Sequence, residues 1–153
     1  MLAAVHAADG YPLRWPADPA AWLTPDHLLA AWVTTSGHRG VIGHVALCRA
    51  AEETGAPVWS AAAGVPADHI AAVARLFVAP GARGFGIGEL LLGTACAWAE
   101  QHDLVAALEV LDRDRHAVAL YERLGWRRVA SAIAPWSAED GAPVLLHHYL
   151  APE

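Results

Sequence analysis

The fold is decided by the stretch Leu76-Phe-Val-Ala-Pro-Gly-Ala-Arg-Gly-Phe-Gly-Ile-Gly-Glu-Leu-Leu-Leu92. An apolar run typical of a β-strand ends at Val78, and a Pro-Gly pair then breaks it. Glycine occupies every second position from Gly84 to Gly88, just before a leucine-rich helical pattern. Glycines allow the backbone to approach a ligand closely, and the N–H groups at the start of a helix suit a phosphate group. The stretch therefore predicts a strand, a loop that holds a pyrophosphate, and a helix.

Two common nucleotide-binding loops do not fit this stretch. The dinucleotide fingerprint requires a third glycine where Glu89 or Leu91 stands, and the nucleoside triphosphate loop requires a lysine, which this chain lacks. The pattern that fits is Arg83-x-x-Gly86-x-Gly88 after a strand. It resembles the coenzyme A loop of the GCN5-related N-acetyltransferases, the GNAT family. Taken alone, an ordinary strand-to-helix turn is the alternative interpretation.

A second motif supports the same resemblance. The segment from Leu108 to Trp126 reads Leu-Glu-Val-Leu-Asp-Arg-Asp-Arg-His-Ala-Val-Ala-Leu-Tyr-Glu-Arg-Leu-Gly-Trp. It is similar to the family pattern Leu-x-Val, Asn, Ala, Leu-Tyr and Gly-Phe, in that order and spacing. Asp114 stands where the family has asparagine, and an ionised aspartate accepts hydrogen bonds but cannot donate them. Two motifs in the right order identify the chain as a member of the GNAT family.

The resemblance covers roughly residues 28–150 and implies an α+β fold in three layers, with a mixed central sheet flanked by helices. Family members place a first strand and two helices before the strand that we expect at Leu28. Because residues 1–27 leave little room, we expect the first strand to be missing or shortened and this part to be atypical. A chain of 153 residues suits one domain, so we expect residues 1–153 to form a single GNAT domain.

Hydrophobic periodicity and turn residues predict the elements in more detail. We expect helices over residues 1–9, 86–102 and 114–124, and strands over residues 28–35, 41–49, 70–78, 104–111, 126–130 and 143–150. The first two strands form an antiparallel hairpin, and a long connection over residues 50–66 is pinned by Trp59. The longest helix turns an apolar stripe to the core, which consists of Ile87, Leu90, Leu91, Thr94, Ala95 and Trp98. Asp114 is placed to cap the helix that follows it.

The resemblance implies that acetyl-CoA is the co-substrate, and it also implies how the coenzyme binds. In the family, two parallel strands splay apart, the pantetheine arm pairs with one of them, and the loop amides take the pyrophosphate. The coenzyme-binding residues implied for this chain are Leu76, Phe77, Val78, Arg83, Gly84, Phe85, Gly86, Ile87, Gly88, Glu89, Asp114 and Tyr121.

Two residues occupy the positions of the family's acid and base. Tyr121 is the implied general acid, because a phenol stays protonated at neutral pH and can protonate a departing thiolate; an inward tyrosine on a helix is otherwise a packing residue. Glu109 is the candidate base, since it lies twelve residues before Tyr121, as in ribosomal-protein N-terminal alanine acetyltransferases. The alternative is that Glu109 faces solvent or pairs with Arg75. His44 and His69 are weaker candidates for the base.

Aromatic residues suggest where the acceptor binds. Tyr11, Trp15 and Trp22 lie among prolines in the segment that covers the acceptor pocket in the family, and Trp136 lies in an expected loop near the C-terminus. We expect Tyr11, Trp15 and Trp136 to contact the acceptor, because such rings bind apolar groups or cations. The alternative, favoured for Trp22, is that the rings fasten the N-terminal segment to the core.

The composition of the chain limits the classes of partner that we expect it to bind. A net charge of -6 with arginines spread along the chain argues against nucleic acid, and no apolar run is long enough to cross a membrane. Cys48 and Cys96 lack a partner motif, which favours a reducing compartment and the cytoplasm. The pair His147-His148 points to opposite faces of a strand, so we expect no metal. Exposed sheet edges make a homodimer plausible.

The sequence thus predicts an N-acetyltransferase that moves the acetyl group of acetyl-CoA directly to a primary amine, with a general base and a general acid. The acceptor is a small amine or a peptide N-terminus, and the Glu109–Tyr121 spacing favours the peptide. The alternative function is a non-catalytic acyl-CoA-binding module.

Overall fold

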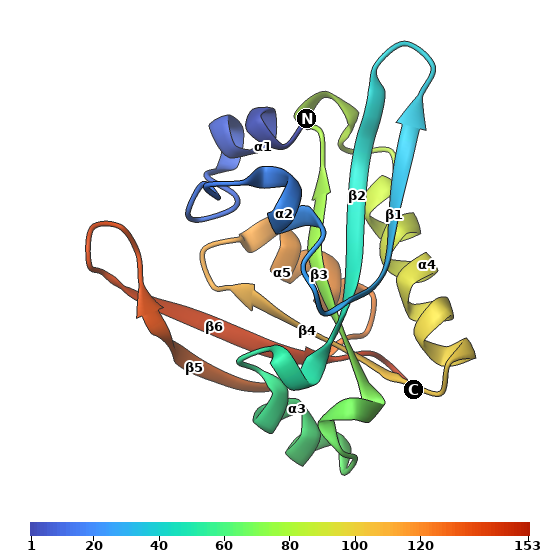
Figure 1. Ribbon diagram of the computed structural model, residues 1–153, viewed down its shortest axis with the longest axis vertical. Coiled ribbons are helices and arrows are strands. Elements are labelled where there is room, and N and C mark those ends of the chain that lie inside the picture. The colour runs from blue at the N-terminus through green and yellow to red at the C-terminus, as the bar shows by residue number, and fades with distance from the viewer. The chain divides into compact units, whose positions relative to one another are not determined.

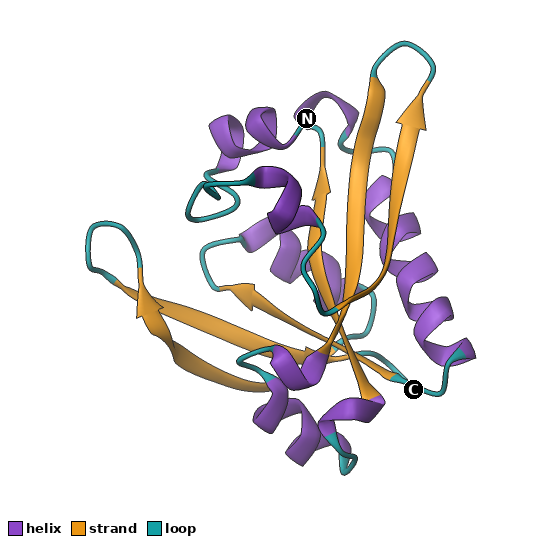
Figure 2. Ribbon diagram, in the orientation of Figure 1, coloured by secondary structure: helices purple, strands orange, loops and turns teal.

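Strands β1 to β6 hydrogen-bond in the order β1-β2-β3-β4-β6-β5 and form one mixed, open sheet flanked by helices (Figure 1; Figure 2). This computed structural model describes residues 1–153. The strands are β1 (Leu28–Ser36), β2 (Gly40–Arg49), β3 (Ile70–Val78), β4 (Val105–Leu111), β5 (Arg127–Ser137) and β6 (Pro143–Leu150). The α-helices are α1 (Leu2–Asp9), α2 (Pro19–Leu23), α3 (Ala56–Ala63), α4 (Ile87–Gln101) and α5 (Arg115–Arg123). Short 3-10 helices are η1 (Ala50–Glu52), η2 (Ala67–His69) and η3 (Pro80–Ala82).

The predicted α+β fold and its mixed sheet are confirmed, and no strand precedes Leu28. None of the helices combines the length and the apolar character that crossing a bilayer requires. The chain divides into two compact units. The first unit comprises Met1–Cys48 and Val73–Ala97, and the second comprises Arg49–Ala72 and Trp98–Glu153.

In the first unit, β1 and β2 form the predicted antiparallel hairpin, which runs from the pair Leu28 and Cys48 to the pair Ser36 and Gly40. Helix α4 lies alongside this hairpin (Figure 1). The buried stripe of α4 consists of Leu91, Leu92, Ala95 and Ala99. Leu90, which we expected in the stripe, is 63% exposed. The predicted helical spacing is confirmed. The buried stripe is rotated around the helix relative to the expected one, because residues 91, 95 and 99 face the sheet.

The close approach of α4 to β2 depends on Gly43. A Cβ atom at this position would lie 2.9 Å from Ile87 Cγ2 and 2.9 Å from Leu91 Cδ1. We expect Gly43→Val to lower the free energy of unfolding by about 1–3 kcal/mol through overpacking. Gly93 in the same helix has no atom within 4 Å of such a Cβ, so Gly93→Ala should raise that free energy by about 1 kcal/mol. Urea denaturation measures both changes, and equal stability of Gly43→Val and the wild type would contradict the packing argument.

The N-terminal segment packs on the end of β3. Leu2 and Val5 of α1 form a buried cluster with Phe77, and Tyr11, Trp22 and Leu23 pack around it. The Trp22 and Phe77 ring centroids lie 6.5 Å apart, and those of Tyr11 and Phe77 lie 6.1 Å apart. The short N-terminal helix and the fastening role of Trp22 are therefore both confirmed.

In the second unit, β6 lies between β4 and β5 and pairs antiparallel with each. Helix α3 packs against β5 and β6, where Trp59 is 1% exposed and contacts a cluster that includes Ala107 and Leu150. The ring of Tyr121 on α5 lies 6.1 Å from that of Tyr149, whereas the Trp59 ring lies 6.0 Å from that of His148. Since adjacent strand residues point to opposite faces, α3 and α5 cover opposite faces of this part of the sheet.

Two expectations for this unit were wrong. The connection over residues 50–66 contains a helix that we did not expect, α3. Pro57 lies in its first turn, and Gly64 ends it with a φ of 70°. Proline suits a first helical turn and glycine a helix end, so both fit this role. Trp136 lies within β5 and not in a loop, because an irregular register between Ile133 and Ser137 lets the strand continue through Pro135.

Candidate active site

The glycine loop has the backbone conformation that its sequence predicts. Strand β3 ends at Val78, η3 follows, and Gly84 and Gly86 have φ values of 84° and 77° before α4 begins. Gly88 lies inside α4 with an ordinary helical backbone. Side chains at φ values of this kind are strained, which explains glycine at the first two positions. The first N–H groups of α4 have no acceptor within the helix, so the loop offers donors to an anion.

Arg83 holds this loop against the N-terminal helix. Its guanidinium donates to both carboxylate oxygens of Asp9, with 3.0 Å between Nη1 and Oδ1, and its Nε donates to the Val78 carbonyl at 3.2 Å. The side chain is therefore committed to α1 and to the end of β3. Arg83 therefore keeps the loop in place, and the donors that the loop can offer are the backbone amides that follow Arg83.

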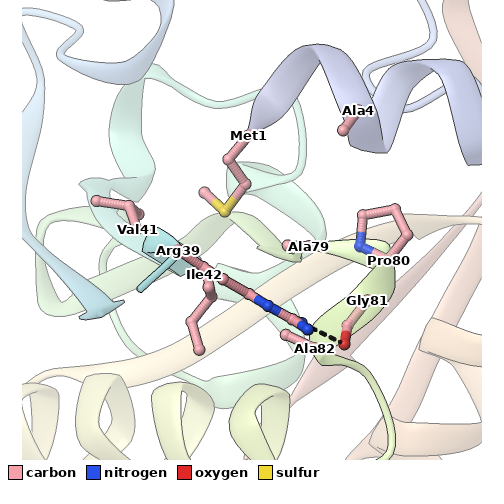
Figure 3. A pocket seen from close by; sticks show the side chains of 9 residues that line it. All are labelled: Met1, Ala4, Arg39, Val41, Ile42, Ala79, Pro80, Gly81 and Ala82. Carbon is pink, nitrogen blue, oxygen red and sulfur yellow. Dashed lines mark hydrogen bonds between the residues drawn. The ribbon is translucent and has the colours of Figure 1, made fainter. Parts of the chain in front are cut away.

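A cavity of about 350 Å³ lies beside the loop (Figure 3). Arg39 extends across it and donates to the Gly81 carbonyl at 3.0 Å, and the Met1 side chain points into it (Figure 3). The rest of its lining is apolar and comes from α1, β2, η3 and the residue before η3: Ala4, Val41, Ile42, Ala79, Pro80 and Ala82. None of the site residues expected from the sequence lines this cavity.

His44 and Arg75 meet in the middle of the first unit. His44 is 7% exposed, its Nδ1 lies 2.8 Å from the Arg75 carbonyl oxygen, and its ring stacks on Phe77 at 5.1 Å. Burial lowers the pKa of His44, so the imidazole is neutral near pH 7. It is thus a packed residue with a fixed partner.

Arg75 departs from regular strand geometry. Its φ of 53° lies in the left-handed region, which bulky residues rarely adopt, although β3 continues through it from Ile70 to Val78. The guanidinium lies 4.9 Å from the centre of the Trp22 ring, and Nη1 lies 3.6 Å from Cys48 Sγ. We expected a polar surface or a carboxylate partner, and the structure places an aromatic ring and a thiol there. The alternative pairing of Glu109 with Arg75 gains no support from these contacts.

Glu109 is the outstanding titratable group of the second unit. Its side chain is 25% exposed, the Thr54 hydroxyl lies 3.5 Å from both carboxylate oxygens, and His148 Nδ1 lies 3.7 Å from Oε2. Burial raises the pKa of the Glu109 carboxyl to about 7, and the nearby charge of Glu53 adds to the rise. A carboxyl group that titrates near neutral pH is suited to removing a proton from an ammonium group.

Tyr121 lies on the opposite face of β4 from Glu109. It is 6% exposed and packs against Trp126 and Tyr149, and its hydroxyl makes no hydrogen bond. Burial raises the pKa of the phenol, so Tyr121 stays protonated at neutral pH. The second unit therefore has a carboxyl group that titrates near neutral pH on one face of β4 and a protonated phenol on the other.

The remaining expected residues are spread over both units. Asp114 precedes α5, but its side chain makes no capping hydrogen bond because the backbone, with a φ of -81° and a ψ of 63°, is not extended. Trp15 is 43% exposed with its ring 5.2 Å from that of His6, Tyr11 is half-buried beside Phe77, and Trp136 on β5 is 37% exposed.

Two hydrogen-bonded chains escaped the sequence analysis. His147 lies 2.7 Å from both Asp112 Oδ1 and Ser131 Oγ, so both imidazole nitrogens are occupied, and His148 points to the other face as expected. Tyr149 donates to Glu122 at 3.0 Å and accepts from Arg128 Nε at 3.0 Å. These partners come from α5, β5, β6 and the residue that follows β4, and no sequence spacing links them.

Comparison with known proteins identifies the family and the fold of the chain. A model of the acetyltransferase (GNAT) family matches residues 7–126. No curated protein sequence proved significantly similar to the chain. Solved structures with the same fold include NAA60 of Arabidopsis thaliana in complex with acetyl-CoA, with a TM-score of 0.70, 18% identity and coverage of 95% of this chain and 88% of that one.

Two further structures share the fold at similar levels. The ribosomal-protein-S18-alanine N-acetyltransferase of Escherichia coli has a TM-score of 0.65 and 16% identity over 99% of this chain and 89% of its own. A GCN5-related N-acetyltransferase from Kribbella flavida has a TM-score of 0.66 and 20% identity over 100% of this chain and 90% of its own.

Proposed function

Because the chain belongs to the acetyltransferase (GNAT) family and is an acyltransferase that uses acetyl-CoA, we propose that it transfers the acetyl group directly to a primary amine. The acceptor is a small molecule or a peptide N-terminus. The carboxyl group of Glu109 is the observation that carries this proposal: it is mostly buried, its pKa is about 7, and it occupies the position of the family's base.

The proposed reaction combines proton transfers with acyl transfer. Glu109 takes a proton from the acceptor ammonium, and the neutral nitrogen attacks the thioester carbonyl carbon. The C–N bond forms as the C–S bond breaks, and Tyr121 donates its phenolic proton to the departing thiolate. The attacking nitrogen then releases its second proton, which restores the phenol, and Glu109 returns its proton to solvent. Burial raises the pKa of Tyr121, so the phenol is protonated at neutral pH when the thiolate forms.

The proposed coenzyme contacts use backbone groups of the first unit. The loop fits a pyrophosphate, because Gly84 and Gly86 adopt left-handed conformations and no atom lies within 4 Å of the position of an added Cβ at either glycine. We assign the pyrophosphate to the amides of residues 84–88 and the pantetheine arm to the backbone of Leu76, Phe77 and Val78. Asp114 is proposed to accept a hydrogen bond from a coenzyme amide.

A peptide N-terminus is the acceptor that we favour. The spacing between Glu109 and Tyr121 supports a peptide acceptor, since the same spacing occurs in the alanine N-acetyltransferases that this segment of the chain resembles. We propose that Tyr11, Trp15 and Trp136 contact the acceptor. Neither Cys48 nor Cys96 forms a disulfide, which supports our proposal of a cytoplasmic location.

The proposal is tested by thiol release. Purified protein with acetyl-CoA is screened against small primary amines and short peptides with free N-termini, and free coenzyme A is measured with a thiol reagent. We expect amine-dependent thiol release, with acetylated product found by mass spectrometry. Binding of acetyl-CoA in calorimetry without thiol release from any acceptor would instead support the non-catalytic acyl-CoA-binding module.

A further inference from the structure

The register of two strands places His148 next to the proposed base. Glu109 on β4 and His148 on β6 are direct partners in the antiparallel ladder. Directly opposed side chains lie on the same face and close together, and His148 Nδ1 lies 3.7 Å from Glu109 Oε2. His148 has no part in the reaction proposed above.

The imidazole of His148 has no hydrogen-bond partner at the nitrogen that faces Glu109. His148 is 5% exposed, and its Nδ1 is buried without a hydrogen bond. An unpaired buried donor costs about 1–3 kcal/mol, and a movement of less than about 1 Å would bring Nδ1 within hydrogen-bond distance of the carboxylate. The Trp59 ring, 6.0 Å away, packs against the imidazole and restricts its movement.

The residues around Glu109 and His148 come from α3 and from the segment that precedes it. Glu53 and Thr54, from the segment between η1 and α3, face the Glu109 carboxyl, and Trp59 of α3 faces His148. His147 is next in sequence, but it lies on the other face of β6 between Asp112 and Ser131. His148 is therefore the one imidazole that contacts the carboxyl group of Glu109.

We propose that His148 is a positioning residue for Glu109, whose carboxylate accepts a hydrogen bond from the His148 Nδ1–H and is thereby aimed at the acceptor amine. This inference rests on the proposed function for the role of Glu109. Burial lowers the pKa of His148, so the imidazole is neutral near pH 7 and serves as a donor without carrying charge. A donor to the charged carboxylate stabilises it, so loss of the donor raises the pKa of Glu109 further.

The test is the titration of Glu109 itself, followed by the carboxyl carbon signal in NMR of selectively labelled protein. In His148→Phe, we expect the Glu109 midpoint to rise by about one pH unit. His148→Gln keeps an N–H donor and should hold the midpoint near that of the wild type. His148→Leu is a second variant without a donor, for use if the phenylalanine variant does not fold.

Tyr149→Phe is the matched control. Tyr149 is the neighbour of His148 on β6, but its side chain lies on the opposite face with Glu122 and Arg128. This change should leave the Glu109 midpoint unaltered. A rise shared by Tyr149→Phe, or an unchanged midpoint in both His148→Phe and His148→Leu, would overturn the inference.

The kinetic consequence separates this inference from the proposed function. If the wild type acetylates an amine, kcat/KM of His148→Phe at pH 6 should fall about tenfold and recover as the pH rises, because a one-unit shift changes the carboxylate fraction tenfold. An inactive wild type would refute the proposed function, yet the NMR midpoints would still decide the contact between His148 and Glu109. An active wild type with identical pH profiles in both proteins would refute the positioning role alone.

Discussion

Replacing Glu109 by glutamine is expected to lower kcat/KM about 10²–10⁴-fold and to remove a titration near pH 7 from its pH profile. The factor is the usual contribution of a general base. The pH dependence follows from the pKa of about 7 that burial gives this carboxyl. In the wild type, kcat/KM should rise through this pKa as the carboxylate forms, and a glutamine cannot form it.

The same change should make the folded protein more stable at alkaline pH. The pKa of Glu109 rises from 4.5 to about 7 on folding, so between these values the folded chain holds a proton that the unfolded chain has lost. The free energy of unfolding therefore falls as the pH rises through this window. Glutamine does not titrate, so Glu109→Gln should be more stable than the wild type at pH 8 by up to about 3 kcal/mol.

Activity and stability thus move in opposite directions, which separates a lost base from a damaged fold. Kinetics across pH and urea denaturation at pH 5 and pH 8 measure the two effects. Glu53→Gln is the control, because Glu53 contributes a charge near Glu109; this variant should stay active with its titration moved to lower pH. An identical pH profile in Glu109→Gln and the wild type would rule Glu109 out as the base.

Local sequence was sufficient wherever one rule governs the backbone. The β3 strand, the left-handed Gly84 and Gly86, and the β1–β2 hairpin follow from apolar runs and turn residues. Helix α3 was not predicted from the sequence, since proline and glycine, as at Pro57 and Gly64, occur both in loops and at helix ends. The exposure of Leu90 also required the tertiary structure, because a period of 3.6 residues leaves the orientation of the stripe open.

The sequence predicted which residues to consider at the site, but it did not predict the surroundings that set their chemistry. The spacing in the family that the chain resembles nominated Glu109, but its raised pKa depends on burial and on the nearby charge of Glu53, which the spacing did not reveal. The contact with His148 depends on the β4–β6 register. α5 and β5 lie between these two strands in the sequence, so no hairpin turn fixes their register.

Tyr121→Phe is expected to lower kcat about 10²-fold or more while leaving the fold intact. A general acid contributes this much by protonating the leaving group, and phenylalanine has no proton to give. The Tyr121 hydroxyl makes no hydrogen bond and its ring packs between Trp126 and Tyr149, so the ring contacts survive and no buried partner is left unsatisfied. Single-turnover kinetics and thermal denaturation measure the two quantities.

Tyr149→Phe gives the opposite pattern and serves as the control for Tyr121→Phe. The Tyr149 hydroxyl bonds to both Glu122 and Arg128, and loss of these bonds should lower the free energy of unfolding by about 1 kcal/mol with kcat nearly unchanged. An acid role also predicts that acyl donors with a more acidic leaving thiol lose less rate in Tyr121→Phe, because such a thiolate departs without protonation. If kcat of Tyr121→Phe stays within about twofold of the wild type, the phenol is a packing residue and the proton reaches the thiolate by another route.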